Sequence, residues 1–543
     1  MKDDEKDQRV RTPWPRIALG ALSGALAGFA ALAVADLLAG LARPQAGPIV
    51  AVGGASIDVT PAAVKDWAVR RFGTDDKVVL QLGILAVLTA LALTSGALAV
   101  RFRRVSAAGI LLLGGVGAAA AVGRPDSTGL TDALPSVGGA AAGALLLYAL
   151  AGRLTTVARS SATTRPSAVT GAEAGPPPSV GWDRRGFVLG AVSAAAVSTA
   201  VGTVGRSLNS SRGRDAIASR DATVLPAPGS PARSAAGRTG LRVRGISPFV
   251  TSNSSFYRVD TALVVPRVDT GDWRLRIHGK GVRRPARHSF DDLLARDLIE
   301  RDITLTCVSN EVGGPYVGNA RWIGVRLADL LAECGVEPPS RGGPADQLVS
   351  RSVDGMTIGT PVEDVMDGRD AMLALGMNGE PLPFAHGFPV RMVVPGLYGF
   401  VSACKWIKDI ELTTFDSYDP YWVRRGWARR APIRTGSRID TPKPFARPAS
   451  GTVMIAGVAW AQGRGIGRVE VRIDDGPWQE ADLAAQDTRD TWRQWSLPWK
   501  ATRGGHTLTV RATDRTGAVQ TAERTRTIPD GASGWHSVVV TVE

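Results

Sequence analysis

The sequence predicts a multi-domain protein, with transmembrane helices first, then an α+β domain and finally a β-sandwich. Three observations support this division of the 543 residues. Long apolar stretches concentrate before residue 206, short strand-like runs alternate with modest helices from about residue 245, and closely spaced strands and turns begin near residue 440. We therefore expect a membrane domain at 1–205, a flexible linker at 206–244, an α+β domain at 245–430 and a sandwich at 440–543.

Five stretches in the first part of the chain are long and apolar enough to cross a bilayer, which takes about twenty residues. They cover residues 17–42, 78–100, 105–123, 133–151 and 186–205. A buried core helix is the alternative for any one stretch, but five so close together favour membrane spans. Basic residues gather at the N-terminus, in the second short loop and before the fifth stretch, so the N-terminus is expected inside. An odd number of crossings then places everything after Gly205 outside the membrane.

Arg184 and Arg185 directly precede the fifth stretch. A paired arginine before an apolar run resembles a twin-arginine export signal, which would suit a domain that folds around a cofactor before export. An ordinary basic flank of a membrane helix is the alternative, and the dipeptide does not decide between them. Residues 207–239, rich in Ser, Arg, Ala, Pro and Gly, then predict a flexible tether.

The composition argues against several functions. The net charge of +14 suggests nucleic-acid binding, but only nine of the 64 basic residues are lysine and no dense basic block occurs, so we expect no nucleic-acid partner. The three cysteines form no CxxCH or CxxC pattern, so no haem or iron–sulfur cluster is expected in this chain. All five histidines follow residue 277, so the apolar stretches cannot hold a bis-histidine haem.

Cys307 is the first candidate for a metal ligand. Residues 302–307 alternate like a strand that ends at this cysteine, and the Gly-containing residues 308–314 predict an abrupt turn. A thiolate at such a turn can point into a cleft and bind a transition metal. The alternative is an ordinary buried free cysteine, which is common in protein cores. Nearby, Ser289 predicts the N-cap of a short helix over 290–296.

Three blocks around this cysteine resemble the sulfite oxidase family of molybdenum enzymes. They are TLTC at 304–307, MNGEPLP at 377–383 running into HGFPVRMVVPG at 386–396, and KWI at 405–407. The resemblance spans roughly residues 246–543 and identifies the chain as a member of this family, of a membrane-anchored bacterial type. It implies an α+β molybdopterin domain, an immunoglobulin-like β-sandwich that serves dimerisation in the family, and a mononuclear molybdenum–molybdopterin cofactor.

The resemblance also implies roles for single residues. It makes Cys307 the metal's thiolate ligand and assigns cofactor contacts to Asn253, Phe256, Tyr257, Asn310, His386, Arg391 and Lys405. Arg391 and Lys405 would bind the phosphate of the pterin. Arg391 would make a bidentate contact, and Lys405 would contribute a single positive charge. The alternatives are that Arg391 pairs with a surface carboxylate, that Lys405 is solvated and that His386 caps a loop. Glu311 is a candidate for catalytic proton transfer or, equally, a solvated carboxylate.

The sequence departs from sulfite oxidases proper at three places. Ser252 and the pair Glu311 and Val312 stand where those enzymes have arginines, and Leu375 stands where they have a catalytic tyrosine. A doubly charged anion needs such arginines, so these departures argue against sulfite as the substrate. We expect two-electron oxygen-atom transfer on a small sulfur- or nitrogen-containing compound. Oxidation of a sulfur compound and reduction of an S- or N-oxide both remain open.

An enzyme of this class needs an electron partner, and we expect a separate cytochrome or quinone-linked protein, with a homodimer as a further expectation. The catalytic part is expected outside the bacterial cell membrane in a multi-pass protein. Two other classes remain open: a non-catalytic, membrane-tethered binding module on the same scaffold, and a transporter or signalling subunit. The scarcity of charge within the apolar stretches, where Asp36 is the clear exception, argues against transport.

Overall fold

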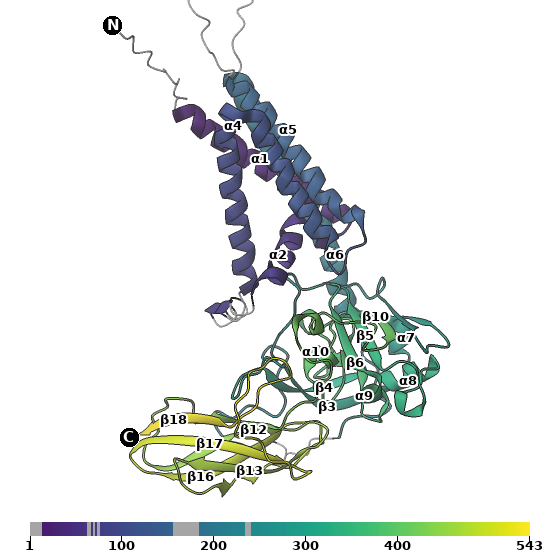
Figure 1. Ribbon diagram of the computed structural model, residues 1–543, viewed down its shortest axis with the longest axis vertical. Coiled ribbons are helices and arrows are strands. Elements are labelled where there is room, and N and C mark those ends of the chain that lie inside the picture. Colours follow the sequence, from purple (N-terminus) through teal and green to yellow (C-terminus); the bar gives the residue numbers. More distant parts are fainter. Residues whose placement is uncertain are drawn as a thin grey trace, which may run out of the picture. The chain divides into compact units, whose positions relative to one another are not determined.

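The computed structural model describes residues 14–61, 64, 67–68, 71–72, 76–155, 184–233 and 240–543 (Figure 1). The chain divides into two compact units. The first comprises Met1–Arg212 with Ala262–Val264, and the second comprises Gly213–Thr261 with Val265–Glu543. The basic residues before Trp14 and most of the basic loop before Arg184, which entered the prediction of orientation, lie outside the described residues.

The first unit is helical. Its helices are α1 Trp14–Leu41, η1 Pro44–Ala46, α2 Pro48–Val59, α4 Asp76–Val122, η3 Leu130–Ala133, α5 Leu134–Thr155 and the first part of α6 Arg184–Ala222. Four of them, α1, α4, α5 and α6, are long and apolar enough by length and composition to cross a membrane. All five predicted apolar stretches are therefore helical, and their crossing of a membrane stays a prediction.

Helix α4 contains the second and third predicted stretches. Phe102 interrupts it with non-helical backbone angles, φ −128° and ψ 57°. Ile84, before the interruption, lies against Gly53 of α2, and Arg124, just beyond the end of α4, donates a hydrogen bond to Val50 O of α2. The two arms of α4 therefore run in opposite directions, as two separate predicted stretches require.

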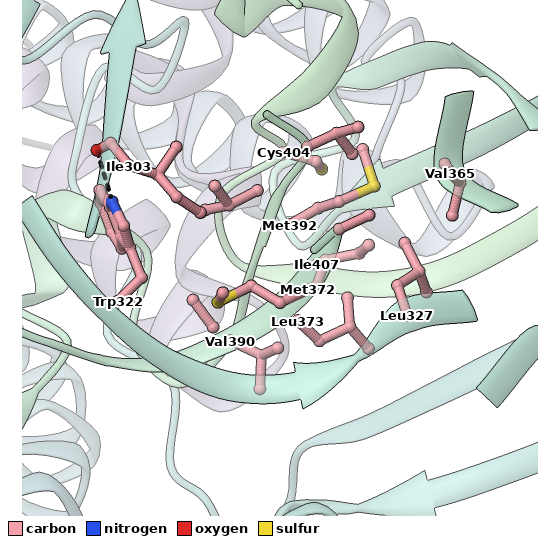
Figure 2. Close-up of a cluster of buried hydrophobic side chains, with 14 of the residues drawn as sticks. Ile303, Trp322, Leu327, Val365, Met372, Leu373, Val390, Met392, Cys404 and Ile407 are labelled. Carbon is pink, nitrogen blue, oxygen red and sulfur yellow. Dashed lines mark hydrogen bonds between the residues drawn. The ribbon is translucent and has the colours of Figure 1, made fainter. Parts of the chain in front are cut away.

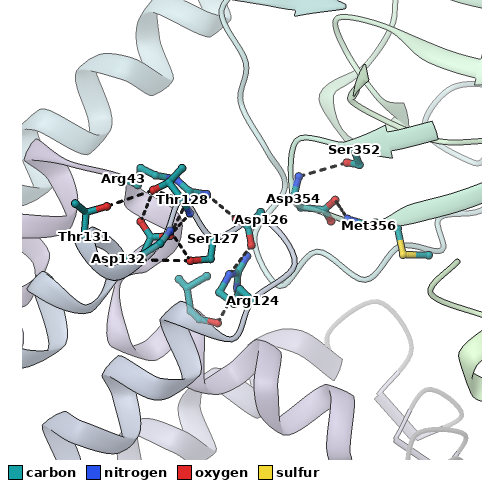
Figure 3. Close-up of polar contacts among 12 residues, drawn as sticks. Arg43, Arg124, Asp126, Ser127, Thr128, Thr131, Asp132, Ser352, Asp354 and Met356 are labelled. Atoms are coloured by element: carbon teal, nitrogen blue, oxygen red, sulfur yellow. Dashed lines mark hydrogen bonds and ion pairs between the residues drawn. The ribbon is translucent and has the colours of Figure 1, made fainter. Parts of the chain in front are cut away.

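Small residues bring the apolar helices of this unit together. A Cβ on Gly24 of α1 would collide with the backbone of α4 at Ala92, and one on Gly96 of α4 would collide with that of α1 at Gly20. Close backbone approach at small residues is typical of helix pairs in membranes, where apolar burial gives little driving force. At one end of the bundle, two arginines and two aspartates form a buried polar cluster, described below (Figure 3).

The prediction of a flexible linker at 206–244 is wrong for its first part, because α6 continues to Ala222. A helix that has already been nucleated extends at little cost. The helix that begins in the apolar stretch therefore continues through the more polar residues that follow. The end of α6 is also fixed by Arg220, which donates hydrogen bonds to Leu382 O at 2.9 Å and Pro381 O at 2.8 Å. Residues 234–239 of the predicted linker lie outside the described residues.

The second unit begins with the α+β domain, which has two sheets. The first has the strand order β2-β1-β10-β5-β6, and the second has the order β3-β4-β7-β8 with β9 paired to β7. The strands are β1 Arg274–Gly279, β2 Ala286–Ser289, β3 Leu298–Thr306, β4 Val317–Arg326, β5 Gln347–Ser352, β6 Thr357–Pro361, β7 Met372–Met377, β8 Glu380–Pro381, β9 Arg391–Val393 and β10 Ile407–Thr413. The short helices are α7 Phe290–Leu294, α8 Leu327–Glu333, η4 Pro339–Arg341, α9 Val362–Met366, η5 Phe384–His386, α10 Gly399–Ser402 and η6 Val423–Arg425. The predicted cap of α7 is confirmed, since Ser289 forms a capping box with Asp292.

One hydrophobic core fills this domain. Strand β7 is buried along its whole length, as its continuous apolar sequence favours for a strand covered on both faces. Figure 2 shows Met372 of β7 and Met392 of β9 among the side chains of this core. Trp322 of β4 is fully buried and donates a hydrogen bond from its indole nitrogen to Ile303 O at 3.2 Å. This packing fixes the ends of β3 and β9, where Cys307 and Arg391 lie.

The rest of the second unit is a sandwich of two four-stranded sheets, β11-β12-β16-β15 and β14-β13-β17-β18, around a second core. The strands are β11 Gly436–Thr441, β12 Gly451–Trp460, β13 Ile466–Ile473, β14 Gln479–Glu480, β15 Asp482–Leu483, β16 Arg493–Ala501, β17 Gly504–Asp514 and β18 His536–Val542. Its β-rich character is confirmed, while its immunoglobulin-like character stays a prediction. The sandwich also supports β3, because Trp492 N donates to Thr304 Oγ1 at 2.7 Å and Gln462 Nε2 donates to Thr304 O at 3.0 Å.

Candidate cofactor site

Cys307 lies where the sequence predicts it, directly after the last residue of β3. Its amide donates to Tyr316 O at 2.9 Å, and its carbonyl accepts from Asn310 N at 3.0 Å, so the chain turns sharply at this point. The thiol is free and buried. Burial raises the pKa of Cys307, while hydrogen bonds from Ser309 and the charge of Lys405 act in the opposite direction. The structure therefore presents a buried sulfur with groups beside it that favour the thiolate.

Arg391 is the most unusual charge near this cysteine. Its side chain is buried, its Nη1 donates to His386 O at 3.1 Å, and its guanidinium carbon lies 4.9 Å from the centre of the Trp322 ring. Its Nε is buried without a hydrogen-bond partner, and no carboxylate of the described residues lies within ion-pair distance. Burial lowers the pKa of Arg391 to about 10. A buried cation without a counter-charge is costly, so this guanidinium fits an anionic group of a ligand.

Lys405 is the second buried cation. Its Nζ donates to Asp260 Oδ2 at 2.9 Å and to Ala385 O at 3.1 Å, and Asp260 also accepts from Arg258 Nε at 2.8 Å. Burial lowers the pKa of Lys405 to about 8, and Asp260 opposes that shift. Gly387, at φ +113°, brings the two cations together, because a Cβ there would lie 3.0 Å from Cβ of Arg391 and 3.2 Å from Cβ of Lys405. Lys405 is thus held by protein groups rather than solvated.

The segment at Asn253 forms the polar wall of the site. His386 Nε2 donates to Asn253 O at 2.9 Å, and Asn378 Nδ2 donates to Asn253 Oδ1 at 2.8 Å. Burial lowers the pKa of His386 to about 4, with Arg391 and Lys405 adding to that shift, so the imidazole is neutral at pH 7. His386 therefore has a role beyond capping a loop, because it joins the Asn253 segment to the backbone carbonyl that binds Arg391.

Aromatic rings fill the space between these polar groups. Phe256 packs edge-on against His386 at 5.6 Å and Trp322 at 5.8 Å, and it stacks on Tyr257 at 5.1 Å. Burial raises the pKa of Tyr257, the Cys307 thiolate raises it further, and Arg391 lowers it. Tyr257 is therefore within electrostatic reach of both the cysteine and the buried guanidinium.

The end of helix α6 is connected to the Asn253 segment through the carboxylate of Glu380. Glu380 accepts from Arg220 Nη2 at 3.1 Å and from Asn253 Nδ2 at 2.5 Å. Glu380 follows the two-residue turn Asn378-Gly379, whose left-handed φ values of 53° and 85° suit a tight hairpin. The end of α6 is thus linked to Asn253, and through it to His386 and Arg391.

Cys307, His386, Arg391 and Lys405 fall within a recognised family domain, and the segment from Asn253 to Asp260 lies just before it. The family model described as "Oxidoreductase molybdopterin binding domain" matches residues 262–422, and the one described as "Mo-co oxidoreductase dimerisation domain" matches residues 437–543. An oxidoreductase of Bacillus subtilis (strain 168), YuiH, is 31% identical over 185 residues, which are 34% of this chain and 87% of that protein. The chain belongs to the sulfite oxidase family of molybdopterin oxidoreductases. The molybdenum–molybdopterin cofactor expected from the resemblance is the cofactor of this family.

The chain is also similar to longer relatives. The mitochondrial sulfite oxidase of Rattus norvegicus is 31% identical over 293 residues, which are 46% of this chain and 53% of that protein. The chain therefore spans about half the length of the sulfite oxidases it matches. The crystal structure of the sulfane dehydrogenase SoxCD from Paracoccus pantotrophus matches with 26% identity and a TM-score of 0.47, covering 55% of this chain and 84% of that one.

The structure brings most of the expected cofactor residues together. The residues that form one connected group are Cys307, Asn253, Phe256, Tyr257, His386, Arg391 and Lys405. Two others lie in the loop that follows Cys307. Asn310 uses its side-chain oxygen to accept from Tyr316 N at 2.8 Å, which closes this loop. Glu311 is exposed and lines a pocket beside the loop with Thr306, Tyr398 and Arg434.

Four residues of the site were not foreseen as site residues: Trp322, Asp260, Arg258 and Tyr398. Trp322 reaches Arg391 from β4, a contact that depends on strand pairing and has no local signal in the sequence. Asp260 and Arg258 lie three and one residues after Tyr257, so continuing the Asn253 segment would have found them. Burial raises the pKa of Tyr398 to about 12, and the Cys307 thiolate contributes to that shift. Tyr398 thus supplies a phenol near the cysteine in a chain that has Leu375 where sulfite oxidases have their tyrosine.

Proposed function

We propose that this chain is a membrane-anchored molybdenum–molybdopterin oxidoreductase. It transfers an oxygen atom, with two electrons, to or from a small sulfur- or nitrogen-containing compound outside the bacterial cell membrane. The observation that carries the proposal is that one group of side chains contains both the free, buried Cys307 and Arg391, a buried guanidinium whose Nε lacks a partner in the described structure. An anionic cofactor would supply the counter-charge that the protein does not.

Each residue of the site has a defined task in this proposal. When bound, the cofactor supplies a metal centre that exchanges an oxygen atom and two electrons with the substrate. Cys307 would hold the metal as a thiolate, which the charge of Lys405 favours. Arg391 and Lys405 would bind the phosphate of the pterin, and neutral His386 would keep the Asn253 segment in place. Oxidation of a sulfur compound consumes one water and releases two protons and two electrons, and reduction of an S- or N-oxide is the reverse.

The pocket beside the cysteine loop supports a neutral or weakly charged substrate. Glu311, Tyr398 and Arg434 line it, and Arg434 pairs with Asp530 at 2.7 Å. A sulfite dianion would meet one exposed carboxylate and one neutralised arginine there, rather than a cluster of free cations. We infer that a sulfoxide, an N-oxide or a neutral sulfur compound suits this pocket better.

The apolar helices and the C-terminal domain support the proposed location of the protein and its proposed partners. The four apolar helices, in which the two arms of α4 make five stretches, and the charge distribution between the stretches support a multi-pass anchor with the second unit outside. The match to a dimerisation domain at residues 437–543 supports a homodimer. A separate cytochrome or quinone-linked protein would exchange the electrons.

The test is the molybdenum and pterin content of the purified full chain, together with turnover of dyes in both directions. Cys307→Ser removes the metal's ligand, and loss of residues that merely orient ligands already costs about 10–100-fold, so we expect turnover to fall by at least about 100-fold. Cys334→Ser is the matched control, because Cys334 is also a free, buried cysteine but follows α8. It should leave metal, pterin and turnover unchanged. Wild-type protein that carries neither molybdenum nor pterin would instead point to a binding module.

A further inference from the structure

Residues 421–430 form an unusual aromatic segment after β10. Trp422 and Trp427 stack at 4.3 Å, and Tyr421 packs edge-on against Trp422 at 5.0 Å. Both tryptophans are only partly buried, so part of each indole is at the surface. We call residues 421–430 the aromatic–arginine face, because the segment also contains four arginines, of which Arg425 lies over the Tyr421 ring at 3.5 Å.

The charge of this region is positive. Between Asp416 and Arg430 the sequence has four arginines and two aspartates, a net charge of +2. Arg429 pairs with Asp419 at 2.8 Å, while Arg424 and Arg430 are exposed. Tryptophan, tyrosine and arginine are the residues most enriched where proteins bind one another. The composition of the face is therefore that of a protein interface with an acidic partner.

The face is connected to the cysteine site through α10. Phe400 of α10 packs edge-on against Trp427 at 4.9 Å, and a Cβ on Gly399 would lie 3.8 Å from Thr306 O, the residue before Cys307. Tyr398, at the start of the same helix, is within electrostatic reach of Cys307. Contacting aromatic rings thus extend from α10, whose first residue lies close to the backbone just before Cys307, to the surface.

We propose that the aromatic–arginine face is the docking site of an acidic one-electron carrier protein. This inference rests on the proposed function, which needs such a carrier but does not say where it binds. Each oxidative turnover releases two electrons, which two carrier molecules docking in succession accept one at a time. In the reductive direction, two reduced carriers deliver them. Arginines around the tryptophans attract an acidic surface and orient it during encounter.

The first experiment measures association and needs no turnover. The full chain is immobilised, and the association rate of an acidic c-type cytochrome is compared for wild type and the double variant Arg424→Glu with Arg430→Glu. Reversing two exposed charges should slow association by about tenfold or more at low ionic strength, and high salt should reduce the difference. Arg503→Glu, an exposed arginine just before β17, is the matched control and should have little effect. A basic cytochrome should show the opposite response.

Two further measurements separate the possible failures. Turnover with a small neutral quinone in place of the cytochrome should be the same in wild type and the double variant. Absence of quinone turnover in wild type would refute the proposed function, whereas normal quinone turnover with unchanged cytochrome association would refute the docking site alone. Vesicles containing anionic lipid test a membrane instead of a protein. If the double variant loses vesicle binding and keeps cytochrome association, the face contacts lipid and the proposal is wrong.

Discussion

Two buried groups of charges in this molecule differ in how they are neutralised. In the first unit, Arg43 bonds to Asp126 at 2.8 Å and to Asp132 at 2.7 Å, and Arg124 bonds to Asp126 at 2.8 Å (Figure 3). In the second unit, Arg391 is buried beside Lys405, and its Nε has no partner among the described atoms. One group satisfies its own charges, and the other leaves a cation unsatisfied.

The difference separates structural charges from binding charges. A carboxylate such as Asp126, with a side chain only 1% exposed, is stable there because two arginines offset its desolvation. Arg391 has no such compensation, so its burial costs free energy in the cofactor-free protein and is recovered when an anion binds. The contrast therefore predicts opposite effects of substitutions at the two kinds of arginine.

The largest effect is expected at Arg391. Arg391→Met should weaken retention of the pterin by about 100-fold, since a hydrogen-bonded charge contributes about 1.5–3 kcal/mol per bond. The same substitution should leave the cofactor-free protein as stable as wild type or more stable, because the uncompensated charge is gone. Pterin content and the thermal unfolding midpoint of cofactor-free protein measure the two effects.

Arg301→Met provides the matched comparison for Arg391. Arg301 of β3 is partly exposed and pairs with Asp370 at 2.6 Å, so its charge is already satisfied. Its loss should lower the unfolding midpoint of cofactor-free protein and spare pterin content. If Arg391→Met destabilises cofactor-free protein as much as Arg301→Met does, the distinction between binding and structural charges is wrong.

The next effect concerns His386 and pH. Burial, with help from Arg391 and Lys405, lowers the pKa of His386 from 6.5 to about 4. Between these values the unfolded chain binds a proton that the folded chain does not, so the free energy of unfolding falls as the pH drops from 6.5 to 4. The whole loss is about 3 kcal/mol. Unfolding of cofactor-free protein should show this slope, and His386→Gln should remove it. An unchanged slope in the variant would mean that other groups are responsible.

Local patterns predict the second unit well because its key features are local. Residues 302–307 alternate, and β3 does end before Cys307, while Ser289 does cap α7. The pairing of α10 with residues 421–430 and the contact of Trp322 with Arg391 arise from tertiary packing, which no periodicity encodes.

The error in the predicted linker has a physical cause of the same kind. Composition predicts a flexible linker after Gly205, yet α6 continues because helix extension is cheap and Arg220 finds acceptors at its end. The composition of a segment predicts its conformation in isolation. It includes neither the helix that precedes the segment nor the tertiary contacts that the segment makes.

The smallest expected effect is in the helical unit. Asp126→Asn keeps the size of the side chain and removes the charge shared by Arg43 and Arg124, which are 24% and 15% exposed. Arg43 keeps Asp132, and both arginines retain some solvent, so we expect a loss of about 1–2 kcal/mol rather than the 3–5 kcal/mol of a fully buried pair. Thermal unfolding of detergent-solubilised protein measures it, with Thr131→Val as a neighbouring exposed control. Molybdenum and pterin content should not change, because the arginines and aspartates of this group neutralise one another. A loss of cofactor in Asp126→Asn would show that the two groups of charges are coupled.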